Sequence, residues 1–168
     1  MQKTLRVKTS EYIDETNRVS FKFNGKSYYG FKGDTLASAL IANDVHLVGR
    51  SFKYHRPRGI MTAGSEEPNA IVQVNDNTDR TEPNVRATEI EIYEGLEASS
   101  QNCWPSVNFD IGGITNVISP FLPAGFYYKT FMWPASFWEK YEYFIRHSAG
   151  LGKSPKDKDP DIYDHRYI

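Results

Sequence analysis

The chain has 168 residues, which suits one domain of ordinary size or a small domain with a substantial extension, and we favour the second arrangement. Its net charge of −1, from 20 basic and 21 acidic residues, gives no global field that would draw in nucleic acid or an anionic membrane, so we expect neither as a partner. The single cysteine, Cys103, excludes an internal disulfide and any site of several thiolates. Because no apolar run approaches the roughly 20 residues of a spanning helix and the start lacks the apolar core of a secretion signal, we expect a cytoplasmic protein.

The first strong signal along the chain is a hairpin. Residues 1–17 are mostly polar and are expected to form an arm or a short extra strand. Apolar and polar residues then alternate from 19 to 23, and Asn24 and Gly25 separate this run from a second one at 26–31. Asn-Gly between two such runs is typical of a tight turn, so the sequence predicts a β-hairpin.

A short helix is predicted at residues 36–42, where apolar side chains fall on one stripe. Asp34 lies just before it and is expected to cap the helix by accepting hydrogen bonds from the free amides of the first turn. Asn43 and Asp44 provide a stop signal.

The loop after this helix carries most of the functional argument. At about twenty residues it is far longer than usual, and the aromatic residues among its cations make disorder the weaker interpretation. The cations could bind a flavin phosphate, a nicotinamide dinucleotide or an acidic patch of another subunit, or they could simply be solvated. The candidate contact residues are Arg50, Lys53, His55, Arg56 and Arg58.

Two further strands are predicted at residues 70–74 and 88–93, with a turn at 75–79. Hairpin, helix, long loop and two strands together predict an α+β protein of the β-grasp class, in which one helix packs across a mixed sheet. We assign residues 1–95 to this domain.

Residues 96–168 lose the alternating pattern and are interpreted as an irregular, aromatic-rich extension with one helix and a charged linker. Aromatic residues are concentrated from 126 to 144, and Pro134 suits the first position of a helix. This helix is apolar on more than one side, which predicts burial between two layers or a surface for another polypeptide. Since no paired carboxylates, nucleophile arrangement or histidines at ligand spacing occur, we predict no catalytic residue and no metal site.

Several motifs resemble the start of the α subunit of heterotetrameric sarcosine oxidase. They are GDTLASAL (33–40), SFKYHRPRG (51–59), SQNCWPS (100–106), PAGFYYKTF (123–131) and AGLG (149–152). In that family the corresponding piece has a ferredoxin-like β-grasp fold and precedes a dinucleotide-binding domain. The chain contains no Gly-x-Gly-x-x-Gly pattern. The resemblance therefore implies a fragment or a short α subunit, with 96–168 leading to a missing dinucleotide-binding domain.

Related flavin dehydrogenase subunits hold a [2Fe-2S] cluster in this domain through four cysteines. By the same resemblance, the four ligand positions correspond to Thr62, Glu67, Ala70 and, on the final strand, Thr88. None of these residues is a thiolate. The resemblance therefore implies that the cluster has been lost while the loop that held it remains.

The resemblance further implies that the complete complex oxidises sarcosine to glycine, using FAD, covalent FMN and NAD, with formaldehyde passed to tetrahydrofolate and hydrogen peroxide released. This chain would supply structure and assembly, would be inactive alone, and would have the rest of the α subunit and the β, γ and δ subunits as partners. The alternative is a stand-alone β-grasp binding module whose basic loop, residues 50–58, captures an anionic ligand or a protein partner.

Overall fold

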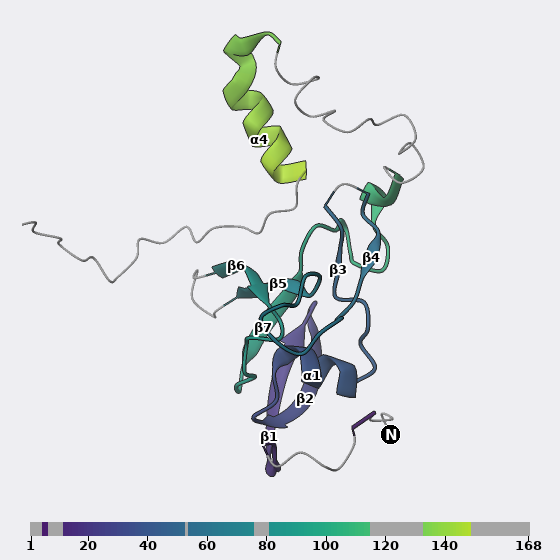
Figure 1. Ribbon diagram of the computed structural model, residues 1–168, viewed down its shortest axis with the longest axis vertical. Helices are drawn as coiled ribbons and strands as arrows, with labels where there is room; N and C mark the ends of the chain where they lie inside the picture. Colours follow the sequence, from purple (N-terminus) through teal and green to yellow (C-terminus); the bar gives the residue numbers. More distant parts are fainter. Residues whose placement is uncertain (1–4, 7–11, 53, 76–80, 115–132, 149–168) are drawn as a thin grey trace, which may run out of the picture.

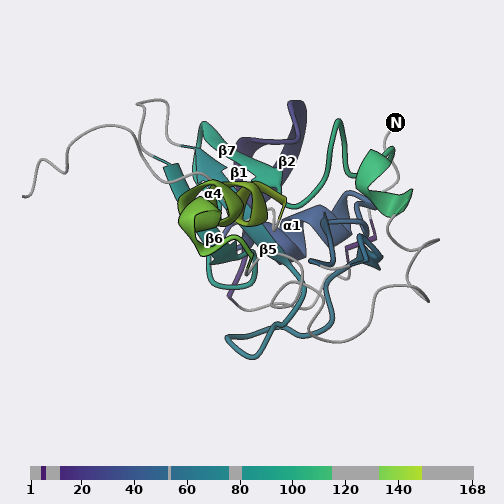
Figure 2. The same ribbon diagram turned by 90° about the horizontal axis from the view of Figure 1, so that it is seen from above.

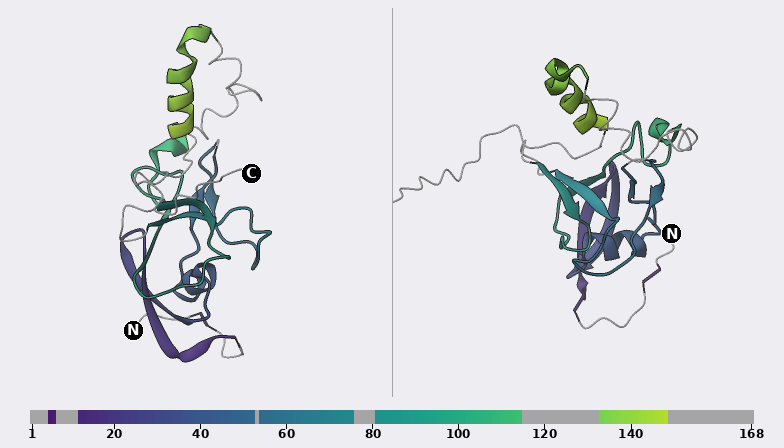
Figure 3. Two further views of the ribbon diagram at one scale, coloured as in Figure 1. Left: turned by 90° about the vertical axis from the view of Figure 1, so that its left-hand side faces the viewer. Right: turned by 45° about the horizontal axis from the view of Figure 1, so that its top comes forward.

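The computed structural model describes residues 5–6, 12–52, 54–75, 81–114 and 133–148 of the chain. Its centre is a mixed sheet with the strand order β2-β1-β7-β5-β6, and α1 lies across one face (Figures 1 and 3). Strands β1 and β7 are parallel, and the other neighbours are antiparallel. The elements are β1 (Asp14–Phe23), β2 (Lys26–Lys32), α1 (Leu36–Ala42), β3 (Gly49–Arg50), β4 (Pro57–Arg58), β5 (Ile71–Asn75), β6 (Thr81–Arg86), β7 (Leu96–Ser100), η1 (Ile111–Gly113), η3 (Ala135–Phe137) and α4 (Trp138–Ser148). This is the predicted α+β, β-grasp architecture.

The hydrophobic core lies between α1 and the sheet. It is built from apolar side chains of β1, α1, β5 and β7, the largest of which are almost inaccessible to water: Phe21, Phe23, Leu36, Leu40, Val72 and Leu96. Each such side chain contributes about 1.5–3 kcal/mol when it is removed from water. The core is therefore formed by residues that the sequence spreads from position 19 to position 98.

The predicted hairpin is confirmed. Strands β1 and β2 pair in register from Val19 opposite Gly30 to Phe23 opposite Lys26. Asn24 and Gly25 have φ angles of 51° and 75°, the left-handed values that a tight two-residue turn requires. Because β1 begins at Asp14, the last residues of the expected amino-terminal arm belong to this first strand.

Helix α1 has the predicted bounds, but the predicted cap is wrong. The side chain of Thr35 accepts the hydrogen bond from the Ser38 amide, at 3.1 Å. Thr35 has the extended backbone of an N-cap residue, whereas Asp34 turns inward and is completely buried. The cap therefore lies one residue later than the sequence suggested.

Asp34 is instead the anion of a buried ion pair with Arg6. Nη1 of Arg6 donates to Oδ1 of Asp34 at 3.0 Å, and Nη2 donates to Oδ2. The carboxylate also accepts hydrogen bonds from the Phe31 amide, at 2.9 Å, and from the Ser38 hydroxyl, at 2.9 Å. The guanidinium lies 4.9 Å from the centroid of the Phe31 ring. These contacts attach the amino-terminal arm to the start of α1.

The predicted strand at 88–93 is wrong. Residues 87–89 form a turn, and Glu91 makes only an isolated bridge with Thr35. The backbone in this segment bonds to the start of α1, with Ile90 accepting from the Leu36 amide at 2.8 Å. Ile92 is buried against the core, which explains the alternation that suggested a strand.

Two strands that the sequence analysis missed complete the sheet. Strand β6 contains a proline, which an edge strand tolerates. Strand β7 is short and mostly polar, yet it lies between β1 and β5 in the centre of the sheet. The sheet therefore continues past residue 95, and we move the proposed end of the β-grasp domain beyond Ser100. The predicted turn at 75–79 lies, from residue 76 onward, outside the described residues.

The helical part of the extension begins later than predicted. Pro134 precedes the short helix η3, and α4 follows from Trp138. Helix α4 contacts η3 and stands apart from the sheet in Figures 1 and 3, although it overlaps the strands in projection when seen from above (Figure 2). Two of its aromatic residues are exposed, with 53% of Trp138 and 58% of Tyr143 accessible. The aromatic residues of segment 126–131 lie outside the described residues.

No helix in the described part of the chain is long and apolar enough to cross a membrane.

Candidate functional site

The basic loop begins with a small hairpin. Strands β3 and β4 pair, with Gly49 opposite Arg58 and Arg50 opposite Pro57. The turn is closed by hydrogen bonds from the Ser51 amide to the Arg56 carbonyl and from the His55 amide to the Ser51 carbonyl. The hairpin therefore presents its cations from an ordered backbone, where the sequence suggested a loop without strands.

Arg50 and His55, two of the five predicted contact residues, bond to the segment that follows β7. Nε and Nη2 of Arg50 donate to the Val107 carbonyl at 2.8 and 2.6 Å. Nδ1 of His55 lies 2.7 Å from Oδ2 of Asp110, whose side chain is only 1% exposed. Arg50 and His55 therefore hold the segment that follows β7 against the hairpin.

The remaining predicted cations differ in their surroundings. Arg56 is exposed, and its guanidinium lies 4.9 Å from the centroid of the Tyr54 ring. Arg58 is also exposed and lines a hollow of about 260 Å³ together with Phe52. Lys53 lies outside the described residues. The predicted contact surface therefore reduces, in the described part of the loop, to Arg56 and Arg58.

The segment that Arg50 and His55 bind carries exposed apolar side chains that the sequence analysis did not assign. They are four large side chains of residues 104–114, which we call the apolar segment: Trp104, Phe109, Ile111 and Ile114, exposed to between 49% and 70%. Asp110 fixes the backbone beneath them, because its Oδ1 accepts from the Trp104 amide at 3.0 Å and from the Gly112 amide at 3.1 Å. An aspartate one residue before Ile111-Gly112-Gly113 is the signal that could have located this cap.

The four positions assigned to a lost cluster lie close together. Oε1 of Glu67 accepts from the amides of Asn69 and Ala70 at 2.8 and 3.1 Å. Its Oε2 accepts from the amides of Met61 and Thr62 at 2.7 and 2.6 Å, and from the Thr62 hydroxyl at 3.2 Å. The Glu67 residue is only 1% exposed. The sequence analysis expected it to shape a turn, and the structure shows it as the centre of the loop.

Thr88 completes this group from a turn, whereas the sequence analysis placed it on a strand. Its hydroxyl donates to the Gly64 carbonyl at 2.8 Å, and the Glu67 amide donates to the same carbonyl at 3.2 Å. Thr88 is therefore linked to Glu67 through the backbone of residue 64.

The hydrogen bonds to Glu67 determine its ionisation. Burial by itself raises the pKa of this carboxyl, but donation from the amides of Thr62, Asn69, Met61 and Ala70 outweighs burial and lowers the pKa to about 2. Relative to the ordinary carboxyl pKa of 4.5, this lowered pKa contributes on the order of 3 kcal/mol to stability. This stabilisation is fully present at a pH above the pKa of Glu67 in the unfolded chain. It is lost as the pH falls through the lower pKa of the folded chain.

The residues at these four positions do not fit a [2Fe-2S] cluster. At the four positions that the resemblance assigns to the ligands, the chain carries two hydroxyls, one methyl group and one carboxylate, whereas such clusters are held by thiolates. The one cysteine, Cys103, is half-buried, and its sulfur lies 4.0 Å from the Ser100 carbonyl; burial raises the pKa of its thiol. Among the described residues, no three His, Cys, Asp or Glu side chains are grouped so that they could hold a metal ion.

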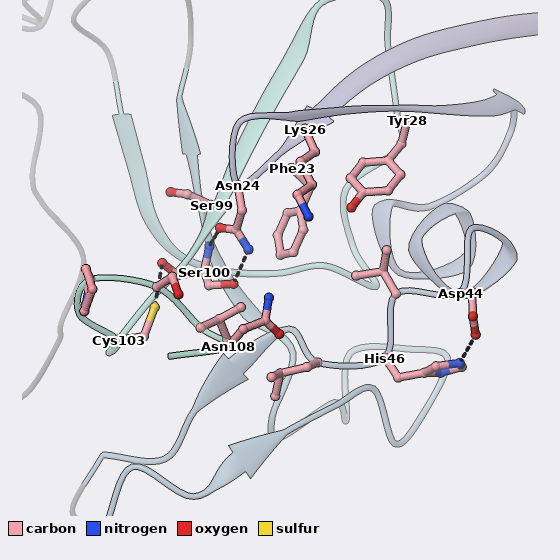
Figure 4. Close-up of a pocket in the computed structure, with 15 residues that line it drawn as sticks. Phe23, Asn24, Lys26, Tyr28, Asp44, His46, Ser99, Ser100, Cys103 and Asn108 are labelled. Carbon is pink, nitrogen blue, oxygen red and sulfur yellow. Dashed lines mark hydrogen bonds and ion pairs between the residues drawn. The ribbon is translucent and has the colours of Figure 1, made fainter. Parts of the chain in front are cut away.

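A separate, larger hollow of about 770 Å³ lies beside the β1–β2 turn (Figure 4). Phe23 and Tyr28 contribute apolar surface. Asn24 and Ser100 hydrogen-bond each other, with the Asn24 amide group donating to the Ser100 hydroxyl at 2.9 Å. His46 is 64% exposed at its side chain and pairs with Asp44 at 2.9 Å. These polar groups bond to one another, so the hollow is not assigned a role.

Comparison with known proteins places residues 16–103 in a family. Residues 16–103 match a family described as a 2Fe-2S iron-sulfur cluster binding domain. The sarcosine oxidase subunit alpha of Rhizobium meliloti (strain 1021) is 62% identical over 153 residues, which cover 90% of this chain and 15% of that protein. The sarcosine oxidase subunit alpha of Corynebacterium sp. (strain U-96) is 37% identical over 89 residues, which cover 52% of this chain and 9% of that protein.

Among solved structures, L-proline dehydrogenase from P. horikoshii matches 58% of this chain and 18% of its own, with 24% identity and a TM-score of 0.43, a likeness too distant to carry an argument. The chain spans about 15% of the length of the Rhizobium protein. The chain belongs to the 2Fe-2S iron-sulfur cluster binding domain family and is homologous to part of the sarcosine oxidase α subunit.

Proposed function

We propose that this chain is a structural and assembly domain of a sarcosine oxidase α subunit, and that it supplies no redox group of its own. The oxidase family suggests flavin chemistry. In this proposal the oxidation of sarcosine to glycine, the transfer of formaldehyde to tetrahydrofolate and the release of hydrogen peroxide belong to other domains and subunits, which bind FAD, FMN and NAD. The partners of the chain are the rest of the α subunit and the β, γ and δ subunits.

The observation that carries this proposal is the apolar segment. Its four large side chains are exposed to solvent, although Asp110 and Arg50 fix the backbone of the segment through hydrogen bonds. If a partner removes about 100 Å² of apolar area from each, the association gains roughly 10 kcal/mol before ordering costs. Because the segment is already fixed, the ordering cost on binding is reduced.

The exposed arginines give the same surface a polar rim. Arg56 and Arg58 lie on the hairpin that Arg50 and His55 bind to the apolar segment. Large apolar residues beside arginine are typical of the energetic centres of protein interfaces. The stand-alone module loses support, because two of its five proposed ligand cations are engaged inside the chain.

The test replaces the apolar side chains in the assembled oxidase. We expect Trp104→Ser with Phe109→Ser to weaken copurification of this domain with the flavin-binding parts by at least about tenfold, since two interface anchors are worth more than about 1.4 kcal/mol. The matched control, Tyr12→Ser with Met61→Ser, removes two side chains that are 90% and 71% exposed elsewhere. Equal copurification of both pairs would contradict the proposal.

A second pair tests the charged rim of the same surface. We expect Arg56→Ala with Arg58→Ala to weaken assembly or flavin retention, more strongly at low than at high salt, because exposed charges are screened by ions. The control pair, Lys26→Ala with Lys32→Ala, removes the same charge from exposed positions on β2. If flavin content and assembly match those of the control pair, Arg56 and Arg58 do not contribute to the proposed contact surface.

A further inference from the structure

The loop around Glu67 is arranged as a receptor for an anion. Four main-chain amides, two on each side of the carboxylate, point at its two oxygens at distances between 2.6 and 3.1 Å. They come from two short stretches, Met61-Thr62 and Asn69-Ala70, which the chain brings to opposite sides of one group. Successive amides that converge in this way form concavities that favour negative charge.

The charge of Glu67 is balanced by these amides. Among the ion pairs of the described residues, none includes the Glu67 carboxylate, although it is almost completely buried. The guanidinium of Arg86 donates from Nε, at 3.2 Å, to the main-chain carbonyl of Glu67. A buried carboxylate without a paired cation is stable only where hydrogen-bond donors replace its water shell. The main-chain amides of the loop thus form the binding site, and the Glu67 carboxylate is the ligand that occupies it.

We propose that residues 61–70 form an anion-binding nest, that the Glu67 carboxylate is its resident anion, and that the emptied nest binds a free small carboxylate. The chemical class follows from the geometry, since two oxygens on one carbon satisfy the two pairs of amides. Formate and acetate have this shape and charge. The inference concerns the chain by itself and does not depend on any assembly.

The experiment empties the nest and refills it. Glu67→Ala is made in the 168-residue chain, and amide hydrogen exchange and thermal unfolding are measured with sodium formate and with sodium chloride at equal ionic strength. We expect exchange protection at Met61, Thr62, Asn69 and Ala70 to fall by at least about tenfold, because unsatisfied buried donors cost more than 1.4 kcal/mol. Formate should restore protection and unfolding temperature in a saturable way, and chloride should not.

Two further variants serve as a control and as a second test of the nest. Glu66→Ala removes an exposed carboxylate one residue earlier and should leave exchange at the four amides unchanged, with or without formate. Glu67→Gln keeps the size but loses the charge and one acceptor oxygen, so it should lose protection and gain nothing from formate, because the site is filled. If Glu67→Ala does not fold, Glu67→Gln decides: wild-type protection in that variant overturns the proposal. A folded Glu67→Ala variant that formate does not restore overturns it equally.

Discussion

A chain that ends after residue 95 should not fold, whereas one that ends after residue 114 should keep the β-grasp domain. Strand β7 begins at Leu96, which is completely buried, and it pairs with β1 on one side and β5 on the other. Without it the sheet separates into two hairpins, and an isolated two-stranded hairpin is marginally stable at best in water. The loss is therefore expected to exceed the 5–15 kcal/mol by which domains are typically stable.

The measurement is far-ultraviolet circular dichroism with cooperative denaturation of both shortened chains. The longer one retains the hydrogen bonds from Arg50 to Val107 and the contact between His55 and Asp110, so it serves as the matched control. A point variant tests the same strand with less disruption: Leu96→Ala should cost about 2–5 kcal/mol, as buried leucines do. A cooperative transition in the chain cut after residue 95 would show that β7 is dispensable.

The second large effect is expected at the buried ion pair that holds the amino-terminal arm. Arg6→Met removes the cation but leaves the Asp34 carboxylate, which is completely buried, without its charge partner. Breaking a buried pair from one side costs about 3–5 kcal/mol, because the remaining carboxylate lacks both water and a cation and keeps only the hydrogen bonds from Phe31 and Ser38. We therefore expect a lowered denaturation midpoint with an unchanged slope.

Arg18 provides the control for this substitution. It is exposed and lies 3.9 Å from the Tyr29 ring centroid, so Arg18→Met should cost only about 0.5–1 kcal/mol. The double variant Arg6→Met with Asp34→Asn should recover part of the loss, since it removes both charges together. If Arg6→Met lowered the free energy of unfolding no more than Arg18→Met, the ion pair between Arg6 and Asp34 would make no measurable contribution to stability.

The parts of the fold that the sequence predicted are those with local signals. The hairpin follows from alternation around Asn24 and Gly25, and α1 from one apolar stripe. Strand β7 had no such signal, because five mostly polar residues become a central strand only through neighbours far away in the chain. The same holds for Arg6, whose partner is 28 residues away.

The candidate site divides in the same way. The cations of the basic loop were visible in the sequence, but their partners Val107 and Asp110 lie 57 and 55 residues further along, so no local pattern could separate Arg50 and His55 from Arg56 and Arg58. The positions Thr62, Glu67, Ala70 and Thr88 came from the resemblance to a family. Their arrangement around one carboxylate is a matter of backbone geometry, which residue types alone do not specify.

The central position of β7 also affects how the chain folds as it is synthesised. Lys22 in β1 and its partner Glu97 in β7 are separated by 75 residues. At synthesis rates of about 5–20 residues per second, roughly 4–15 s pass between the two, and domains generally fold as units. During that interval Phe21 and Phe23 lack the central strand beside β1, and a hairpin of two strands alone is marginally stable at best. The sheet closes only when its last strand in the sequence enters between two strands made earlier, so we expect its apolar face to stay uncovered for longer during synthesis than in a protein whose neighbouring strands are consecutive.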